Sequence, residues 1–151
     1  MNLIDLSDHL LAEIVLRVQR PRSMIITCRT LHDALSSSAA LRVRWGVAHH
    51  GPYAVRHACR SGCSSEIVRR ILTEDGGPIQ QELDAALYDA AARCSGPDGA
   101  EAVAALIQHG ASHSVTHGVS GDTPLNVACI RGETDIARVL VCAGAKVGFG
   151  L

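Results

Sequence analysis

The sequence predicts an all-α protein in which a short solenoid of helical hairpins follows a three-helix module. Three observations support this fold class. A Gly-Ala pair occurs at Gly110 and again at Gly144, and each pair follows a run of apolar residues at helical spacing. The first 48 residues lack this period and carry a different helical pattern. Aromatic residues are only 3% of the chain, too few for the faces of a typical β-sandwich or barrel.

The clearest hairpin lies between Gly121 and Ala145. Thr123 can cap a helix, and Pro124 suits the first helical position because its missing N–H costs nothing there. Gly132 then permits a tight turn. The second helix has its apolar residues at i, i+3 and i+4, namely Ile136, Val139 and Leu140. The pattern therefore predicts a helix-turn-helix unit.

This hairpin resembles an ankyrin repeat. The family signature T-P-L-H-x-A appears from Thr123 to Ala128, with Asn126 in the position of the histidine. The inter-helix Gly132 and the terminal Gly144 extend the resemblance. An ankyrin repeat implies a stack in which each unit contacts only its neighbours, and in which the first helices and the hairpin tips form a protein-binding surface.

A second unit precedes the clearest one. Residues 84–92 match the first helix of the repeat, and residues 102–111 match the second. A few extra residues, Ser95 to Asp98, are expected at the turn between the two helices. Asp98 and Glu101 have the spacing of a capping box at that turn.

The first unit is the most diverged, with helices expected over residues 55–62 and 66–72. Cys59 and Cys129 occupy the same place in their repeats, where a small buried hydrophobic residue is expected. The ankyrin repeats are therefore predicted to occupy residues 53–151, in three units at about 53–80, 84–117 and 121–151.

The sequence pattern of residues 1–48 predicts three short helices. Ser7 can cap the first helix, whose apolar residues recur at helical spacing until Pro21 ends it. A second helix is expected from Ser23, and a short third segment covers residues 41–45. This stretch forms the predicted N-terminal module.

The N-terminal pattern resembles an F-box, through Leu6 to Val18, Cys28-Arg29 with Leu31, and Leu41 with Trp45. Ser7 stands where the family usually has proline, and the stretch from Pro21 to Cys28 is about one helical turn short. An F-box implies docking on the Skp-family adaptor of a cullin-type ubiquitin ligase. The adaptor-facing residues would be Leu6, Leu10, Ile14, Val15, Met24 and Ile25. The alternative is that this apolar stripe only forms the core of a bundle that caps the solenoid.

The resemblance to ankyrin repeats also implies a set of partner-binding residues. They would lie on the concave surface and at the hairpin tips, at Tyr88, Asp89, Asp122, Asn126, Ile130 and Arg131. The alternative is that these are ordinary solvated positions. With three units the surface would be small, so affinity would depend on a few anchoring side chains.

Charge and cysteine content argue against several other partners and locations. The formal net charge of -1 gives no electrostatic footprint for nucleic acid or an acidic membrane. Six cysteines without a signal peptide or tight spacing predict reduced thiols and an intracellular location, in the cytoplasm or nucleus. No segment has the roughly 18 apolar residues that span a bilayer.

No catalytic, metal or cofactor site is expected. The chain shows neither a nucleophile with its base nor a glycine-rich phosphate loop. Cys59 and Cys63 lie near His49, His50 and His57, but the spacing is not that of a zinc finger. A second set recurs every fourth residue in a turn-rich stretch that argues against one aligning helix: His109, His113 and His117.

The sequence therefore predicts a non-catalytic adaptor that recruits a substrate protein to a Skp-cullin-type ubiquitin ligase. The alternative is a plain ankyrin scaffold whose N-terminal helices only cap the solenoid. The terminal face of a solenoid normally needs a cover. We therefore expect Phe149 and Leu151 to fold back over the helix that contains Val139 and Val141.

Overall fold

The computed structural model describes residues 39–62, 64–73, 78–116 and 121–146, and the regular elements in these ranges are all helices. The first two predicted helices of the N-terminal module lie outside the described residues. So do its proposed adaptor-facing residues, Leu6, Leu10, Ile14, Val15, Met24 and Ile25. The predicted tail contacts of Phe149 and Leu151 lie outside them as well.

Six helices form three consecutive hairpins. Their bounds are α5 (Ala54–Arg60) and α6 (Ser65–Thr73), α7 (Gln80–Arg93) and α8 (Gly96–Gln108), and α9 (Pro124–Arg131) and α10 (Thr134–Cys142). A further helix, α4 (Ala39–His50), and a 3-10 turn, η2 (Gly51–Tyr53), precede them. None of the described helices is long and apolar enough to cross a membrane.

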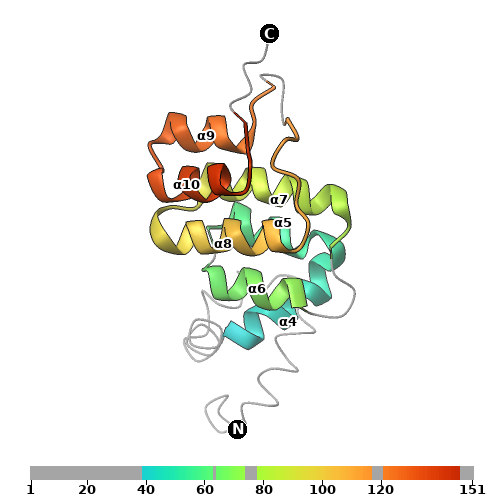
Figure 1. Ribbon diagram of the computed structural model, residues 1–151. Helices are drawn as coiled ribbons and strands as arrows, with labels where there is room; N and C mark the ends of the chain where they lie inside the picture. Colours follow the sequence, from blue (N-terminus) through green and yellow to red (C-terminus); the bar gives the residue numbers. More distant parts are fainter. Residues whose placement is uncertain (1–38, 63, 74–77, 117–120, 147–151) are drawn as a thin grey trace, which may run out of the picture.

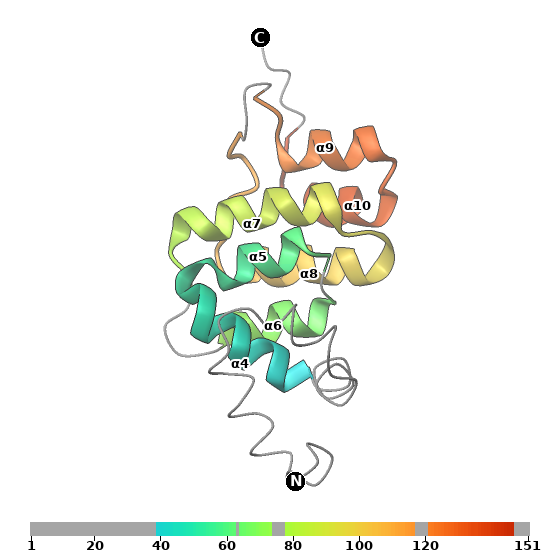
Figure 2. The same cartoon turned by 180° about the vertical axis from the view of Figure 1, so that it is seen from behind.

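The hairpins stack in two layers, as Figures 1 and 2 show. The inner layer consists of the first helices, in which α5 packs against α7 and α7 against α9. The outer layer consists of α4, α6, α8 and α10, each in contact with the next. The predicted all-helical solenoid is confirmed for this part of the chain.

The local signals predicted for α9 are confirmed. Thr123 is the N-cap, and its side-chain oxygen accepts a hydrogen bond from the Asn126 N–H at 3.3 Å. Pro124 occupies the first helical position. Gly132 ends the helix with φ 73°, a left-handed conformation that favours glycine.

Helix α7 is longer than the sequence predicted, because it begins at Gln80 rather than near Asp84. Where α9 has Thr123 and Pro124, the aligned residues 85–86 of α7 are both alanine. Neither a capping side chain nor a proline marks the start of a helix at these two positions. Because alanine favours a helical conformation, α7 extends through them toward its N-terminus.

The added turn of α7 holds the segment that follows α8. Gln80 Nε2 donates to the carbonyl oxygen of Gly110 at 2.7 Å. Asp84 Oδ1 accepts a hydrogen bond from the Ser112 N–H at 2.7 Å. The first turn of α7 therefore has no side-chain cap of its own and is instead held by hydrogen bonds to the segment after α8.

The predicted turn and capping box of the middle unit are wrong. Only Cys94 and Ser95 lie between α7 and α8, because Gly96 already begins α8 and Pro97 fits its first turn. The Asp98 carboxylate does not cap its own helix. It accepts hydrogen bonds from the backbone N–H of Ser65 at 3.1 Å and from the Ser65 hydroxyl.

Small side chains allow the helices to approach closely. Several alanines are completely buried, including Ala86, Ala90, Ala91 and Ala102. They pack around a column of fully buried larger residues: Leu87, Leu106, Leu125, Ile136 and Leu140. Cys59 is also completely buried, which confirms that it is a core residue.

The expectation of burial is wrong for Cys129, which is exposed. Its counterpart Cys59 is covered because α5 packs against α7, and the Cys94 thiol donates to the Cys59 carbonyl oxygen at 3.8 Å. Within the described residues, no repeat follows α9. The same position in the last repeat therefore faces outward.

Helix α4 covers the opposite end of the stack. It packs against α5 and α6, and Val43 joins the common core with 1% exposure. The predicted third segment of the N-terminal module, residues 41–45, lies inside this helix. One end of the stack is thus closed by α4, while α9 and α10 form the other (Figure 1).

Candidate protein-binding surface

The structure places the predicted partner-binding residues on two adjacent inner helices and directly before one of them. Tyr88 and Asp89 lie on α7. The others are Asp122, immediately before the N-cap of α9, and Asn126, Ile130 and Arg131 within α9. Four are half-buried: Tyr88, Asp89, Asp122 and Asn126. Because α7 packs against α9, the residues form a contiguous candidate surface, which we call the inner-helix surface.

Ile130 is the most exposed large apolar side chain in the described residues, with 77% of its surface accessible. Tyr53, directly before α5, is 56% exposed and was missed from the sequence. The available signal was that Tyr53 is one of only two tyrosines in the chain. Exposed apolar and aromatic side chains are typical anchors of protein interfaces.

Asp89 links the first two repeats. Arg56 Nε donates to Asp89 Oδ2 at 3.1 Å, and Arg56 Nη1 lies 3.7 Å from Glu82 Oε2. Glu82 is buried, so the Arg56 guanidinium provides the charge partner that a buried carboxylate needs. Arg56 and Glu82 were not among the residues that the sequence pattern indicated. The 33-residue separation of Arg56 from Asp89, close to the repeat period, was the available signal.

Arg131 joins the second and third repeats. Its Nη1 donates to the carbonyl oxygens of Ala91 and Cys94, both at 2.9 Å, and its Nη2 donates to Ser95 Oγ at 3.3 Å. These carbonyls lie at the C-terminal end of α7, where backbone acceptors lack partners within the helix. The guanidinium proposed for partner binding therefore has a structural role.

The helices α6 and α8 are each capped by a carboxylate from the following repeat. Asp98 accepts from the backbone N–H of Ser65, the first residue of α6. Glu133 accepts from the backbone N–H of Gly96, the first residue of α8, at 3.1 Å. The Gly96 N–H, the Ser95 hydroxyl and the Arg131 charge hold the pKa of Glu133 below its ordinary value. These contacts fix the register between neighbouring repeats.

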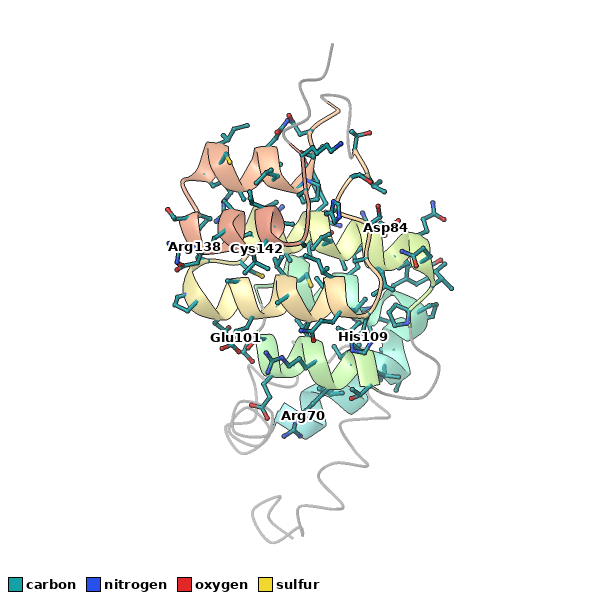
Figure 3. All side chains as sticks on the ribbon, in the orientation of Figure 1. Arg70, Asp84, Glu101, His109, Arg138 and Cys142 are labelled. Atoms are coloured by element: carbon teal, nitrogen blue, oxygen red, sulfur yellow. The ribbon has the colours of Figure 1, made fainter. Side chains whose placement is uncertain are left out.

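The histidines and cysteines do not assemble a metal site in the described ranges, where no group of three metal-ligating residues occurs. His109 follows α8 and is exposed, as Figure 3 shows, whereas His113 is half-buried. Cys63 and His117 lie outside the described residues.

His50 and His57 stack between α4 and α5, with ring centroids 4.1 Å apart. Burial lowers the pKa of His50, and the neighbouring His57 and His49 lower it further. The unfolded chain therefore takes up a proton at a higher pH than the folded chain does.

We expect the free energy of unfolding to decrease as the pH falls below 6.5, the ordinary pKa of His50, toward its lower folded-state pKa. The His50→Gln variant should show a smaller decrease, because it removes the group that must be protonated. Urea unfolding at a series of pH values measures this slope. The exposed His109→Gln variant is the control. An unchanged slope in His50→Gln would contradict the assignment.

Comparison with known proteins identifies the family. A family model described as ankyrin repeats (3 copies) matches residues 55–149. No F-box domain was detected. No curated protein and no solved structure matches the chain. The matched residues contain the first hairpin except for Ala54, the other two hairpins, and the whole inner-helix surface on α7 and α9. The chain therefore belongs to the ankyrin-repeat family.

Proposed function

We propose that this ankyrin-repeat scaffold binds a partner protein through its inner-helix surface, with Ile130 as the principal anchor. The observation that carries the proposal is the 77% exposure of Ile130 on a helix whose Leu125 and Ala128 are buried in the core. A large aliphatic side chain held in solvent by a rigid helix gains most when a partner covers it.

The charges of the inner layer support an apolar anchor rather than an ionic one. Glu82 and Asp89 both pair with Arg56, and Asp84 accepts from the Ser112 N–H. These carboxylates already have internal partners, so recruiting them to an interface would sacrifice contacts within the repeats. Ile130 and Tyr53 can be buried without such a loss.

We expect Ile130→Asp to weaken binding of the partner by about thirtyfold, the effect of losing an anchor worth roughly 2 kcal/mol. The partner would first be captured with the intact chain and identified, and the purified pair would then be measured by calorimetry. Val141→Asp is the matched control, because Val141 is also exposed and apolar but lies in the outer layer. Equal weakening by both variants would contradict the proposed surface.

The finer function that we propose is recruitment of this partner to a ubiquitin ligase through the F-box-like residues 1–48. The support is the apolar stripe of Leu6, Leu10, Ile14 and Val15, together with Met24 and Ile25. The packing of α4 against the first repeat would join such a module directly to the solenoid. The alternative remains that residues 1–48 only cap the stack, which is what α4 (Ala39–His50) does in the described part of the chain.

Co-purification of the intact chain with a Skp-family adaptor tests this step. We expect the adaptor to bind the wild-type chain and to be lost in Leu10→Glu and Ile14→Glu variants that retain their helical circular dichroism. Variants that instead unfold the solenoid would support the cap. A well-folded wild-type chain that does not bind the adaptor would leave a plain ankyrin scaffold and would contradict the ligase role.

A further inference from the structure

The exposed charges at the ends of the inner helices are positive. Arg60 is the last residue of α5 and Arg93 the last residue of α7, and both side chains are exposed. Neither forms a hydrogen bond or an ion pair in the part of the chain that the structure describes. The carboxylates of the three inner helices all lie on α7 and are all engaged by other groups of the chain: Glu82, Asp84 and Asp89. The two arginines therefore supply the charge that these helices offer to a partner.

The two arginines lie in a row with Ile130. Arg60 and Ile130 occupy the same position of the first and third repeats, directly after the aligned Cys59 and Cys129. Arg93 lies one residue beyond that position in the second repeat. The three inner helices run in the same direction and pack side by side, so their C-terminal ends lie on one side of the stack (Figure 2). Two exposed guanidinium groups are thus aligned with the exposed Ile130.

Arg131 shows how an arginine at such a helix end acts when it stabilises the stack. Its guanidinium donates to the carbonyl oxygens of Ala91 and Cys94 in the neighbouring repeat. Arg60 and Arg93 make no such contacts. Their contribution to the fold is limited to the weak attraction between a cation and the C-terminal end of its own helix. Both guanidinium groups can therefore bind a partner without loss of an internal contact.

We propose that the partner segment that covers Ile130 is acidic. It presents an aliphatic residue to Ile130 and carboxylates to Arg93 and Arg60, and the proposal rests on the proposed function because it takes Ile130 as the anchor. Packed helices lie about 8 to 10 Å apart, and a polyproline II segment rises about 3.1 Å per residue with three residues per turn. Carboxylates about three and six residues from the aliphatic residue would therefore reach the two arginines from one side of the segment.

A protein segment fits this row better than a nucleic acid does. Ile130 offers neither a charge to a phosphate nor a flat aromatic face to a base. Two exposed arginines neutralise few phosphates, and the formal net charge of the chain is -1. Carboxylates beside an aliphatic residue match all three positions. The arginines would mainly set the rate and specificity of association, while the apolar anchor supplies affinity.

Selection of peptides of random sequence, about twelve residues long, against the full chain tests the proposal. We expect the selected peptides to combine an aliphatic residue with Asp or Glu, and fluorescence anisotropy should show that salt weakens their binding. Arg60→Glu and Arg93→Glu should each raise the dissociation constant about fivefold. Arg138→Glu, an exposed change on the outer helix α10, should not. Replacement of the matching peptide carboxylate by lysine should restore binding to Arg60→Glu.

Selected peptides that are neutral or basic would overturn the proposal, and so would a selection that yields no binder. Ile130→Asp distinguishes this failure from failure of the proposed function. If it abolishes binding of a neutral peptide, the anchor stands and only the acidic partner is wrong. If it leaves binding of an acidic peptide unchanged, both are wrong. A single-stranded oligonucleotide that binds more tightly than the selected peptides, and is lost in Arg60→Glu, would instead assign the arginines to a nucleic acid.

Discussion

The Leu106→Ala variant should lower the free energy of unfolding by about 2 to 5 kcal/mol. Leu106 is fully buried in α8, the outer helix of the middle repeat, and α8 packs against both α6 and α10. The truncation loses the transfer free energy of the side chain and leaves a cavity between helices that cannot easily close. Urea unfolding followed by circular dichroism measures the loss.

Val141→Ala is the matched control for this truncation. Val141 is an aliphatic residue of the next outer helix but is 58% exposed, so its truncation should change stability by less than about 0.5 kcal/mol at low protein concentration. If the two variants are destabilised equally, the middle repeat does not form the centre of a continuous core.

The Arg131→Met variant should lower stability by about 2 kcal/mol, the range for hydrogen bonds that involve a charged group. Methionine keeps much of the aliphatic volume but cannot donate to the carbonyl oxygens of Ala91 and Cys94. Because these bonds join the second and third repeats, amide hydrogen exchange should accelerate most in α9 and α10.

Arg138→Met is the control for Arg131→Met. Arg138 lies on α10 (Figure 3) and is exposed, without a hydrogen bond or ion pair in the described ranges. Its replacement should leave both stability and exchange nearly unchanged. Arg131→Lys should recover only part of the loss, because an ammonium group does not reproduce the fork of guanidinium donors. Exchange that accelerates uniformly over all helices in Arg131→Met would contradict a role confined to this junction.

The features that sequence analysis predicted correctly depend on local signals. Thr123, Pro124 and Gly132 act within a few residues of the helix ends that they define, so a single repeat contains all the information needed. The same is true of the apolar spacing in α10, where Ile136 and Leu140 are fully buried.

The features that were missed depend on residues one repeat away. Asp98 resembles a local helix cap in the sequence, but its carboxylate accepts a hydrogen bond from Ser65 of the preceding repeat, as the Glu133 carboxylate does from Gly96. Helix α7 begins early because no Thr-Pro pair stops it, and its added turn is stabilised by Gly110 and Ser112 at the end of the hairpin. Local spacing does not specify these partners.

The candidate site shows the same division. The prediction that Ile130 is exposed on an inner helix follows from the resemblance to ankyrin repeats, and 77% of its surface is accessible in the structure. Asp89 and Arg131 occupy equally plausible positions on the same helices, but both are engaged with neighbouring repeats. The position of a residue in the repeat therefore predicts whether it lies on the inner-helix surface. The interactions of each polar side chain depend on which residues the neighbouring repeat places beside it.

Site-specific photo-crosslinking tests most directly whether the inner helices bind a protein. A photoreactive amino acid would replace Ile130 or Tyr53 in the inner layer, and Gln108 or Arg69 in the outer layer, in the full-length chain within its native cells. The account predicts that the two inner positions crosslink to the same protein and that the two outer positions do not. Crosslinks to that protein from the outer positions alone would contradict it.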